Sequence, residues 1–283
     1  IEGVVGTDGN DEYDGDDSSL NTLHRIYNPD EVNLNALGRA DENYEAFAPG
    51  LGDDVITGGS GYTELNYAFG SDSSRSVNVY LVDGIATISE SGNTYTDKFT
   101  SVEGVEGSNG DDFIYGNALA NSLDGRKGND LIDGGDGFDY VEYNGGPNAV
   151  TVDLNVGVAV DQWGSTDQLY HIEGVIGSGH NDVFYGSTSR DNAYFGKQGY
   201  DTLIYHEAFD AFDVKKISND LFHITYVANG TVDVVDNIGR VKFADATINL
   251  AAYGPSGPME LVQLGEQDDV LYGDAANQYV IST

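Results

Sequence analysis

The chain has no cysteine and only 12 lysines and arginines among its 283 residues. The absence of cysteine excludes disulfides, thiolate zinc sites and thiol catalysis. No segment approaches the ~18 consecutive apolar residues of a membrane-spanning helix, so we expect no membrane insertion. The basic residues are outnumbered by 48 aspartates and glutamates, which gives a formal charge of −36. This charge excludes nucleic acid and anionic membrane surfaces as electrostatic partners.

Glycine is abundant, with 38 residues, and it recurs every nine residues between 107 and 142 as GSNGDDFIY, GNALANSLD, GRKGNDLID and GGDGFDYVE. Each unit opens with glycine, has Asp or Asn at its sixth position and carries an aliphatic residue at its eighth. These positions are Gly107, Gly116, Gly125 and Gly134; Asp112, Asn121, Asp130 and Asp139; and Ile114, Leu123, Ile132 and Val141. Glycine leaves loop carbonyls uncovered, and carbonyls beside carboxylates make an oxygen-only environment that suits calcium. The period therefore predicts a calcium-binding parallel β-roll.

Stacked acidic loops repel one another. Two carboxylates about 4.5 Å apart repel by roughly 4 kcal/mol at an effective dielectric constant near 20. A divalent cation between them reverses the sign, so we expect metal binding and folding to be one coupled equilibrium. Two alternatives are a halophile-type acidic surface and Asp-Gly turns that hold no metal.

A longer repeat encloses the nonapeptides. The phrase IEGVVGTDGND (1–11) returns as VEGVEGSNGDD (102–112), IEGVIGSGHND (172–182) and, in degenerate form, LVQLGEQDD (261–269). We therefore expect three units and the start of a fourth: 1–101 with an insert at about 16–47, 102–171, 172–260 and 261–283. Because the chain begins with Ile1 rather than Met, we expect a processed product or an excised piece of a longer tandem array.

Alternating apolar residues between the arrays predict half-buried strands. The segments 77–82 and 84–89, and likewise 150–154 and 156–160, are expected to form hairpins, and 211–250 a longer set of strands. The predicted fold is therefore all-β, with β-roll turns alternating with antiparallel strand pairs in an elongated repeat rod. The insert is left unassigned, with a short helix after Asp41 as one alternative.

These nonapeptides resemble the RTX, or haemolysin-type, calcium-binding repeat of secreted bacterial proteins. Its consensus is G-G-x-G-x-D-x-U-x, where U is a large aliphatic residue, and residues 125–142 match it nearly in full. The phrase NIGRVKFADATINL (237–250) also resembles a segment common in such proteins. The resemblance implies a right-handed roll in which two nonapeptides make one turn, so that loops 18 residues apart stack and share an ion.

The same resemblance implies the ligands. Asp112 and Asp130 are expected to share one calcium ion, while Asn121 and Asp139 make a weaker or empty site because Asn121 is neutral. The carbonyls that assist Asp112 and Asp130 are expected from Gly107, Asn109, Gly125 and Lys127. Further expected ligands are Asp182 with Asp201, 19 residues apart, Asp11 with Asp54, and Asp269. Thr63 stands where an aspartate would be a ligand, so one ligand is expected to be lost there.

No catalytic motif is present in the sequence. The five histidines are dispersed, and no H-E-x-x-H, G-x-S-x-G or P-loop sequence occurs. The insert residues His24, Arg25, Tyr27 and Asp30 are more simply read as a solvated loop than as a site. The 19 tyrosines and Trp163 leave a sugar-stacking platform open as an alternative to ordinary packing.

We therefore expect a noncatalytic, calcium-loaded module that is secreted, extracellular or at the surface of a bacterium. Its use is expected to be structural or adhesive, with surface polysaccharide or other copies of itself as further partners. One alternative is an accessory module of a secreted polysaccharide-modifying enzyme whose catalytic domain lies outside this chain, and another is an enzyme within the insert and strand segments. The RTX resemblance also implies export by type I secretion in an unfolded state.

Overall fold

The computed structural model describes strands 4–5 and 12–14, residues 44–59, 61–68, 75–218 and 220–250, and strands 270–273 and 278–281. These residues are almost entirely strand and turn, with one 3-10 turn, η1 (Phe209–Ala211). The chain divides into unit 1, Ile1–Asn144 with Trp163–Ile172, and unit 2, Gly145–Gln162 with Glu173–Thr283. Among the described residues no helix is long and apolar enough to cross a membrane.

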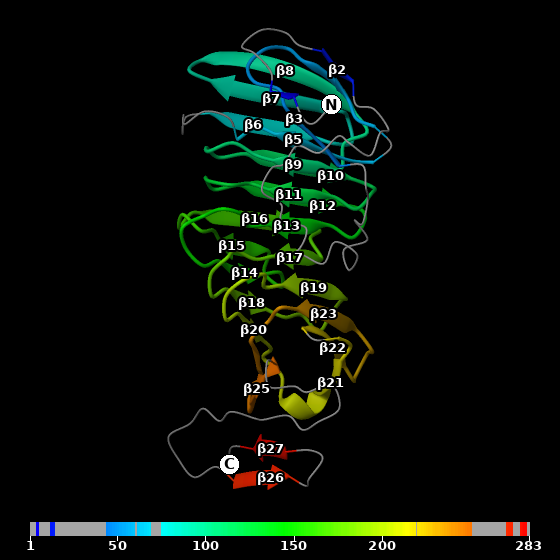
Figure 1. Cartoon of the computed structure of the whole chain (residues 1–283), viewed down its shortest axis with the longest axis vertical. Helices are drawn as coiled ribbons and strands as arrows, with labels where there is room; N and C mark the ends of the chain where they lie inside the picture. Colours follow the sequence, from blue (N-terminus) through cyan, green and yellow to red (C-terminus); the bar gives the residue numbers. More distant parts are fainter. Residues whose placement is uncertain are drawn as a thin grey trace. The chain divides into compact units, whose positions relative to one another are not determined.

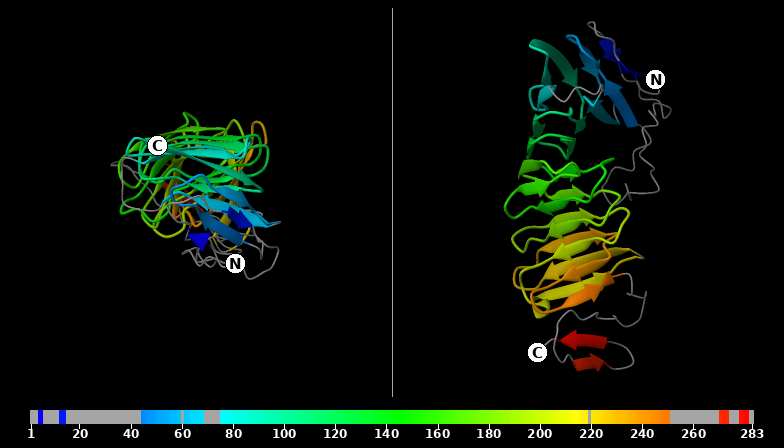
Figure 2. Two further views of the ribbon diagram at one scale, coloured as in Figure 1. Left: turned by 90° about the horizontal axis from the view of Figure 1, so that it is seen from above. Right: turned by 90° about the vertical axis from the view of Figure 1, so that its left-hand side faces the viewer.

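The strands of unit 1 fall into two sheets, in which neighbouring strands lie side by side (Figures 1 and 2). The first is parallel throughout, in the order β1 (Val4–Val5), β3 (Tyr44–Ala48), β5 (Tyr62–Asn66), β9 (Gly104–Glu106), β11 (Ser122–Asp124) and β13 (Tyr140–Glu142). The second runs β2 (Glu12–Asp14), β4 (Val55–Thr57), β8 (Asn93–Thr100), β7 (Ile85–Glu90), β6 (Ser76–Tyr80), β10 (Phe113–Asn117), β12 (Leu131–Gly135) and β16 (Thr166–Tyr170). In the second sheet β7 is antiparallel to both neighbours, and the other pairs are parallel.

Each nonapeptide carries the chain from one sheet to the other. β9, β11 and β13 belong to the first sheet, whereas β10 and β12 belong to the second. Ile114 lies opposite Ile132, and Leu123 lies opposite Val141, so partners are separated by 18 residues. The predicted β-roll, with two nonapeptides in each turn, is thereby confirmed. The aliphatic residues at the eighth position, Ile114, Leu123, Ile132 and Val141, are fully buried, and so are Phe184, Tyr194 and Leu203 in unit 2.

The end of the predicted insert belongs to the roll. Residues 44–48 form β3, which pairs with β5 so that Tyr44 lies opposite Tyr62 and Phe47 opposite Leu65, again 18 residues apart. For these residues the alternative of a helix after Asp41 is wrong, because their backbone pairs in parallel with β5. The rest of the insert, 16–43, lies outside the described residues.

Unit 2 repeats the arrangement with its own strands (Figure 1). One set runs β17 (Gly174–Ile176), β19 (Asn192–Phe195), β23 (Val232–Asp236), β22 (Leu221–Tyr226) and β21 (Phe212–Lys216). The other runs β15 (Val158–Val160), β14 (Thr151–Asp153), β18 (Val183–Tyr185), β20 (Thr202–Ile204), β24 (Arg240–Lys242) and β25 (Thr247–Asn249). Val183 lies opposite Thr202, a 19-residue step that absorbs the extra residue in the middle nonapeptide. A separate antiparallel pair joins β26 (Val270–Gly273) and β27 (Gln278–Ile281).

The predicted strand pairs are confirmed as antiparallel insertions into the roll. β6 and β7 form one hairpin, β14 and β15 another, and the segment 211–250 supplies β21 to β25. Gly84 at the first turn has a φ of 65°, and a Cβ there would collide with the carbonyl oxygen of Phe99. The first hairpin therefore needs glycine at its turn for two independent reasons.

Candidate metal sites

In five nonapeptides the sixth-position carboxylate lies against the glycine that opens the unit. A Cβ built on Gly125 would collide with Oδ2 of Asp130, and one built on Gly196 would collide with Oδ2 of Asp201. The same relation holds for Gly107 and Asp112, Gly134 and Asp139, and Gly177 and Asp182. The repeated glycine is therefore required because it makes room for a carboxylate beside the backbone.

Successive turns are joined through these loops by two opposed hydrogen bonds. The backbone N–H of Asp112 donates to Oδ1 of Asp130, at 2.9 Å. In the other direction, the N–H of Asn129 donates to Oδ1 of Asp111, at 2.7 Å. Here the fifth-position side chain of Asp111 binds the following turn, and the sixth-position carboxylate of Asp130 binds the preceding one.

The same pairing occurs in unit 2 and, in part, on the other side of the roll. Asp182 N–H donates to Oδ1 of Asp201 at 2.7 Å, and Tyr200 N–H donates to Oδ1 of Asn181 at 2.8 Å. Between Asn121 and Asp139 the first bond is present, at 2.7 Å. The second has no counterpart there because the fifth residue of that unit is alanine, which offers no side-chain acceptor.

The loops have two conformations, which we call closed and open. In the closed loops, 107–112, 116–121 and 177–182, the N–H of the second residue donates to the side chain of the sixth. The donors are Ser108 to Asp112 Oδ2 at 2.6 Å, Asn117 to Asn121 Oδ1 at 2.8 Å, and Ser178 to Asp182 Oδ2 at 2.6 Å. In the open loops, 49–54, 125–130, 134–139 and 196–201, the second and fourth residues have positive φ. Those residues are Gly50, Gly52, Arg126, Gly128, Gly135, Gly137, Lys197 and Gly199.

In two of the open loops, 125–130 and 196–201, one carboxylate oxygen of the sixth residue is left without a hydrogen bond among the described residues. Oδ2 of Asp130 and Oδ2 of Asp201 are buried and have no hydrogen-bond partner among the described residues. Burial, followed by the nearby charges of Asp112 and Asp167, raises the pKa of Asp130 to about 10. Burial likewise raises the pKa of Asp201 to about 7. Each site therefore favours a positive charge or a proton beside the carboxylate.

The residues present fit calcium. Buried carboxylate oxygens and glycine-loop carbonyls are hard oxygen donors, which calcium prefers. Stacking brings the carbonyls near as well, because a Cβ on Gly107 would lie 3.0 Å from the carbonyl oxygen of Gly125. Within the described residues no three acidic or histidine side chains gather in a way that could hold a metal ion. Carboxylates meet in pairs, so carbonyls would supply the remaining ligands.

The family described as the RTX calcium-binding nonapeptide repeat matches the chain in four copies, at residues 50–62 and 106–141. This chain carries RTX calcium-binding repeats. No curated protein matches it. One similar solved structure is the extracellular lipase LipA from Serratia marcescens, at 12% identity over 83% of this chain and 37% of that chain. Its TM-score of 0.17 is too low to support any inference about function.

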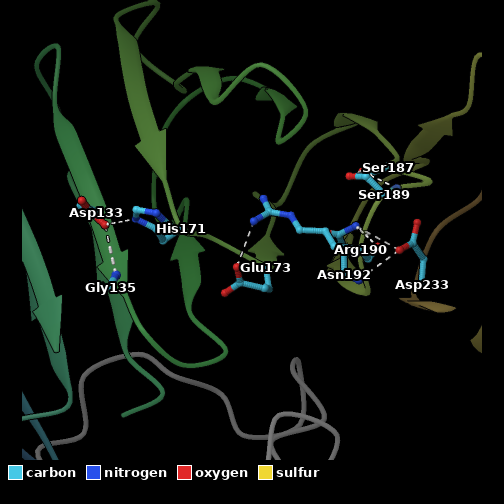
Figure 3. A network of polar contacts seen from close by, with 9 residues as sticks. All are labelled: Asp133, Gly135, His171, Glu173, Ser187, Ser189, Arg190, Asn192 and Asp233. Carbon is cyan, nitrogen blue, oxygen red and sulfur yellow. Dashed lines mark hydrogen bonds and ion pairs between the residues drawn. The ribbon is translucent and has the colours of Figure 1, made fainter. Parts of the chain in front are cut away.

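Three aspartates outside the RTX repeats extend this series of hydrogen bonds between successive turns, which we call the ladder. Asp54 N–H donates to Asp97 Oδ1 at 3.0 Å, Asp130 N–H to Asp167 Oδ1 at 3.1 Å, and Asn192 N–H to Asp233 Oδ1 at 3.0 Å. The opposed bond is also present in each case, from Thr96 to Asp53, from Thr166 to Asn129 and from Val232 to Asp191. Figure 3 shows Asn192 beside Asp233, with the nearby ion pair between Arg190 and Glu173.

These three residues were not predicted from the sequence because they lie 37 to 43 positions from their partners, outside any nonapeptide. A signal was nevertheless present for two of them. Asp97 and Asp167 each follow a threonine and stand six residues before the glutamate of the phrases VEGV and IEGV.

The structure brings together three of the predicted ligand pairs: Asp112 with Asp130, Asn121 with Asp139, and Asp182 with Asp201. Asp54 is the last residue of the open loop 49–54, and its backbone N–H donates to Oδ1 of Asp97. Asp11 and Asp269 lie outside the described residues. At Thr63, where a ligand was expected to be lost, the backbone N–H donates to Oε2 of Glu103 at 2.9 Å.

Proposed function

We propose that this chain is a noncatalytic calcium-binding module whose folding depends on calcium, and that it serves as a structural or adhesive part of a secreted or cell-surface bacterial protein. The observation that carries this proposal is the stack of buried carboxylates in the open loops, above all Asp130 and Asp201, whose Oδ2 atoms have no hydrogen-bond partner within the described ranges. Such groups are costly to bury without a counter-charge.

Calcium is proposed at the stacked loop pairs. Asp112 and Asp130 share one ion, with carbonyls supplied by Gly107, Asn109, Gly125 and Lys127. Asp182 and Asp201 share another, and Asn121 with Asp139 forms a weaker site because one side chain is neutral. Asp11 with Asp54, and Asp269, are proposed as ligands of further ions.

The proposed dependence of folding on calcium follows from the charge of the chain. With a formal charge of −36, the metal-free chain resists compaction, and divalent ions relieve the repulsion where carboxylates stack. Low cytoplasmic calcium would keep the chain unfolded and ready for export, and calcium outside the cell would fold it. Proteins with RTX repeats are typically secreted by bacteria, which supports a secreted setting and export by type I secretion.

The tandem phrases support a structural or adhesive use. We propose 1–101, 102–171 and 172–260 as successive building units, with 261–283 beginning another. Stacked repeats bury a continuous core by nearest-neighbour contact, which suits a spacer or a surface array.

The experiment that tests the proposal is a calcium titration of the metal-free chain, followed by far-UV circular dichroism. Calcium should produce the β-sheet signal, a chelator should remove it, and magnesium should fail to replace calcium because it binds poorly to flexible all-protein oxygen sites. A β-sheet spectrum that is the same with and without calcium would reject the coupling. Incubation with neutral and acidic polysaccharides should release no shortened or unsaturated sugars, and such products would reject the noncatalytic assignment.

A further inference from the structure

A buried tyrosine follows the last unit of each array. Tyr67, Tyr143 and Tyr205 stand four residues after the sixth-position residues Thr63, Asp139 and Asp201. In every other described unit of the arrays, glycine occupies that place: Gly58, Gly116, Gly125, Gly134, Gly186 and Gly196. All three tyrosines are buried. A large ring therefore replaces the glycine that would open another nonapeptide.

Each of these tyrosines donates its hydroxyl to an aspartate that lies outside the RTX repeats. Tyr67 donates to Asp97 Oδ2 at 3.0 Å, Tyr143 to Asp167 Oδ2 at 3.3 Å, and Tyr205 to Asp233 Oδ2 at 2.5 Å. The other oxygen, Oδ1, of each aspartate accepts the backbone N–H of a repeat loop. Both oxygens of these three carboxylates are therefore hydrogen-bonded.

This arrangement contrasts with that of the open loops. Asp130 Oδ2 lies against Gly125 and has no hydrogen-bond partner among the residues that the structure describes. Asp167, one turn further along the same ladder, accepts a hydrogen bond from the hydroxyl of Tyr143. Burial raises the pKa of the Tyr143 phenol well above its usual value, so the hydroxyl keeps its proton and remains a donor. Hydrogen bonds at both oxygens stabilise a buried carboxylate. Asp112 also accepts them at both oxygens, from Val77 and Ser108, but it lies against the glycine of its own nonapeptide loop, whereas Asp167 lies outside any nonapeptide.

We propose that Tyr67, Tyr143 and Tyr205 are terminal caps that decide where calcium binding stops. Each cap fills the space of a further glycine loop and gives its hydroxyl to the last carboxylate of the ladder. Asp97, Asp167 and Asp233 consequently join the stack of turns but bind no calcium. This inference rests on the proposed function, because it concerns which carboxylates of the roll are calcium ligands.

The test compares two isosteric variants of the full chain, Asp167→Asn and Asp130→Asn, by counting bound calcium in equilibrium dialysis. Asp130→Asn should bind one ion fewer than the wild type. Asp167→Asn should bind the wild-type number with an affinity within about twofold, and its thermal midpoint should fall by about 2–4 °C through loss of a buried hydrogen bond. Loss of one ion in Asp167→Asn would overturn the proposal.

Tyr143→Phe provides a milder variant, because it keeps the ring and removes only the hydroxyl. Tyr143→Phe should bind the wild-type number of ions, and its thermal midpoint should fall by about as much as that of Asp167→Asn. The thermal midpoint of the double variant Tyr143→Phe/Asp167→Asn should be no lower than that of the less stable single variant. The reason is that both changes remove the same hydrogen bond. If the falls in thermal midpoint of the two single variants add fully in the double variant, or if Tyr143→Phe binds fewer ions than the wild type, the assignment of Tyr143 as a cap is overturned.

The cap at Tyr67 and Asp97 gives an independent measurement with Asp97→Asn, in which the ion count should again be unchanged. The two proposals fail in different ways. A wild-type chain that binds no calcium rejects the proposed function together with the caps. A wild-type chain that binds calcium, but loses an ion with Asp97→Asn or Asp167→Asn, rejects the caps alone.

Discussion

The backbone N–H of Asp112 donates to Oδ1 of Asp130 at 2.9 Å, while Oδ2 of Asp130 accepts no hydrogen bond from the part of the chain that the structure describes. One oxygen of the carboxylate therefore sets the register between two turns, and the other is left for a cation. If Asp130 binds calcium as proposed, both tasks fall on one side chain, and calcium binding would be coupled to the 18-residue register.

We expect Asp130→Asn to weaken calcium binding more than Asp139→Asn. Asp130 stacks on another carboxylate, Asp112, whereas Asp139 stacks on the neutral Asn121. At a free calcium concentration of about 100 times Kd, loss of one ion removes about 2.7 kcal/mol of stability. Isothermal titration with each variant measures the number of ions and their affinity. Equal losses in the two variants would contradict the ranking of the sites.

The 18-residue register was predictable because it follows from a period of nine and a parallel roll, and Ile114 opposite Ile132 follows it directly. The pairing of Asp182 with Asp201 was predictable in the same way once the extra residue was counted. The partners of Asp54 and Asp130 outside the repeats were not predictable from the period. Hairpin strands are inserted between the stacked turns, and only the folded backbone brings Asp97 and Asp167 back into the ladder.

The distinction between open and closed loops also could not be predicted from the sequence. Arg126 and Lys197 have φ values of 66° and 63°, although neither is glycine, so residue type did not mark these positions. The closed loop at 107–112 is set by Ser108, whose N–H and hydroxyl both donate to Asp112. A serine at the second position is an ordinary loop residue and predicts no such contact by itself.

Acid should partly replace calcium in folding the chain. Burial raises the pKa of Asp112 from 3.8 to about 7, and that of Asp201 by the same amount, so the metal-free fold binds protons more tightly than the unfolded chain does. Stability from this source is fully present below about pH 4 and is lost as the pH rises through 7. Calcium-free protein should therefore gain β-sheet signal in circular dichroism as the pH falls from about 8 to about 5. A signal that stays flat or falls would show that these carboxyl groups do not titrate in this way.

Calcium affinity should show the opposite dependence. Protons compete with the ion for the same carboxylates, so the affinity should weaken as the pH falls through 7. A titration of the same preparation at several pH values measures this, and an affinity that rises on acidification would contradict ligation by these groups.

The interior aliphatic positions should dominate stability in the calcium-loaded state. Ile132 is fully buried opposite Ile114, and Ile132→Ala should cost about 2–5 kcal/mol because it leaves a cavity between turns. Leu119 is 60% exposed and provides the control, for which Leu119→Ala should change stability by less than about 0.5 kcal/mol. Denaturant unfolding at saturating calcium gives both values. Similar losses in the two variants would argue against a packed interior at Ile132.

Adding one methyl group at a loop glycine should separate the role of space from that of backbone strain. Gly125 does not have a left-handed φ, yet a Cβ there would collide with Oδ2, Cγ and Cβ of Asp130. Gly125→Ala should therefore displace the carboxylate, cost about 1–3 kcal/mol and weaken calcium binding. Gly179, in the loop 177–182, has open space where its Cβ would lie, and Gly179→Ala should be neutral or stabilise by up to about 1 kcal/mol. Calcium titration and thermal unfolding of the two variants make the comparison. Unchanged calcium affinity in Gly125→Ala would mean that the glycine at the first position does not hold the site open for the carboxylate.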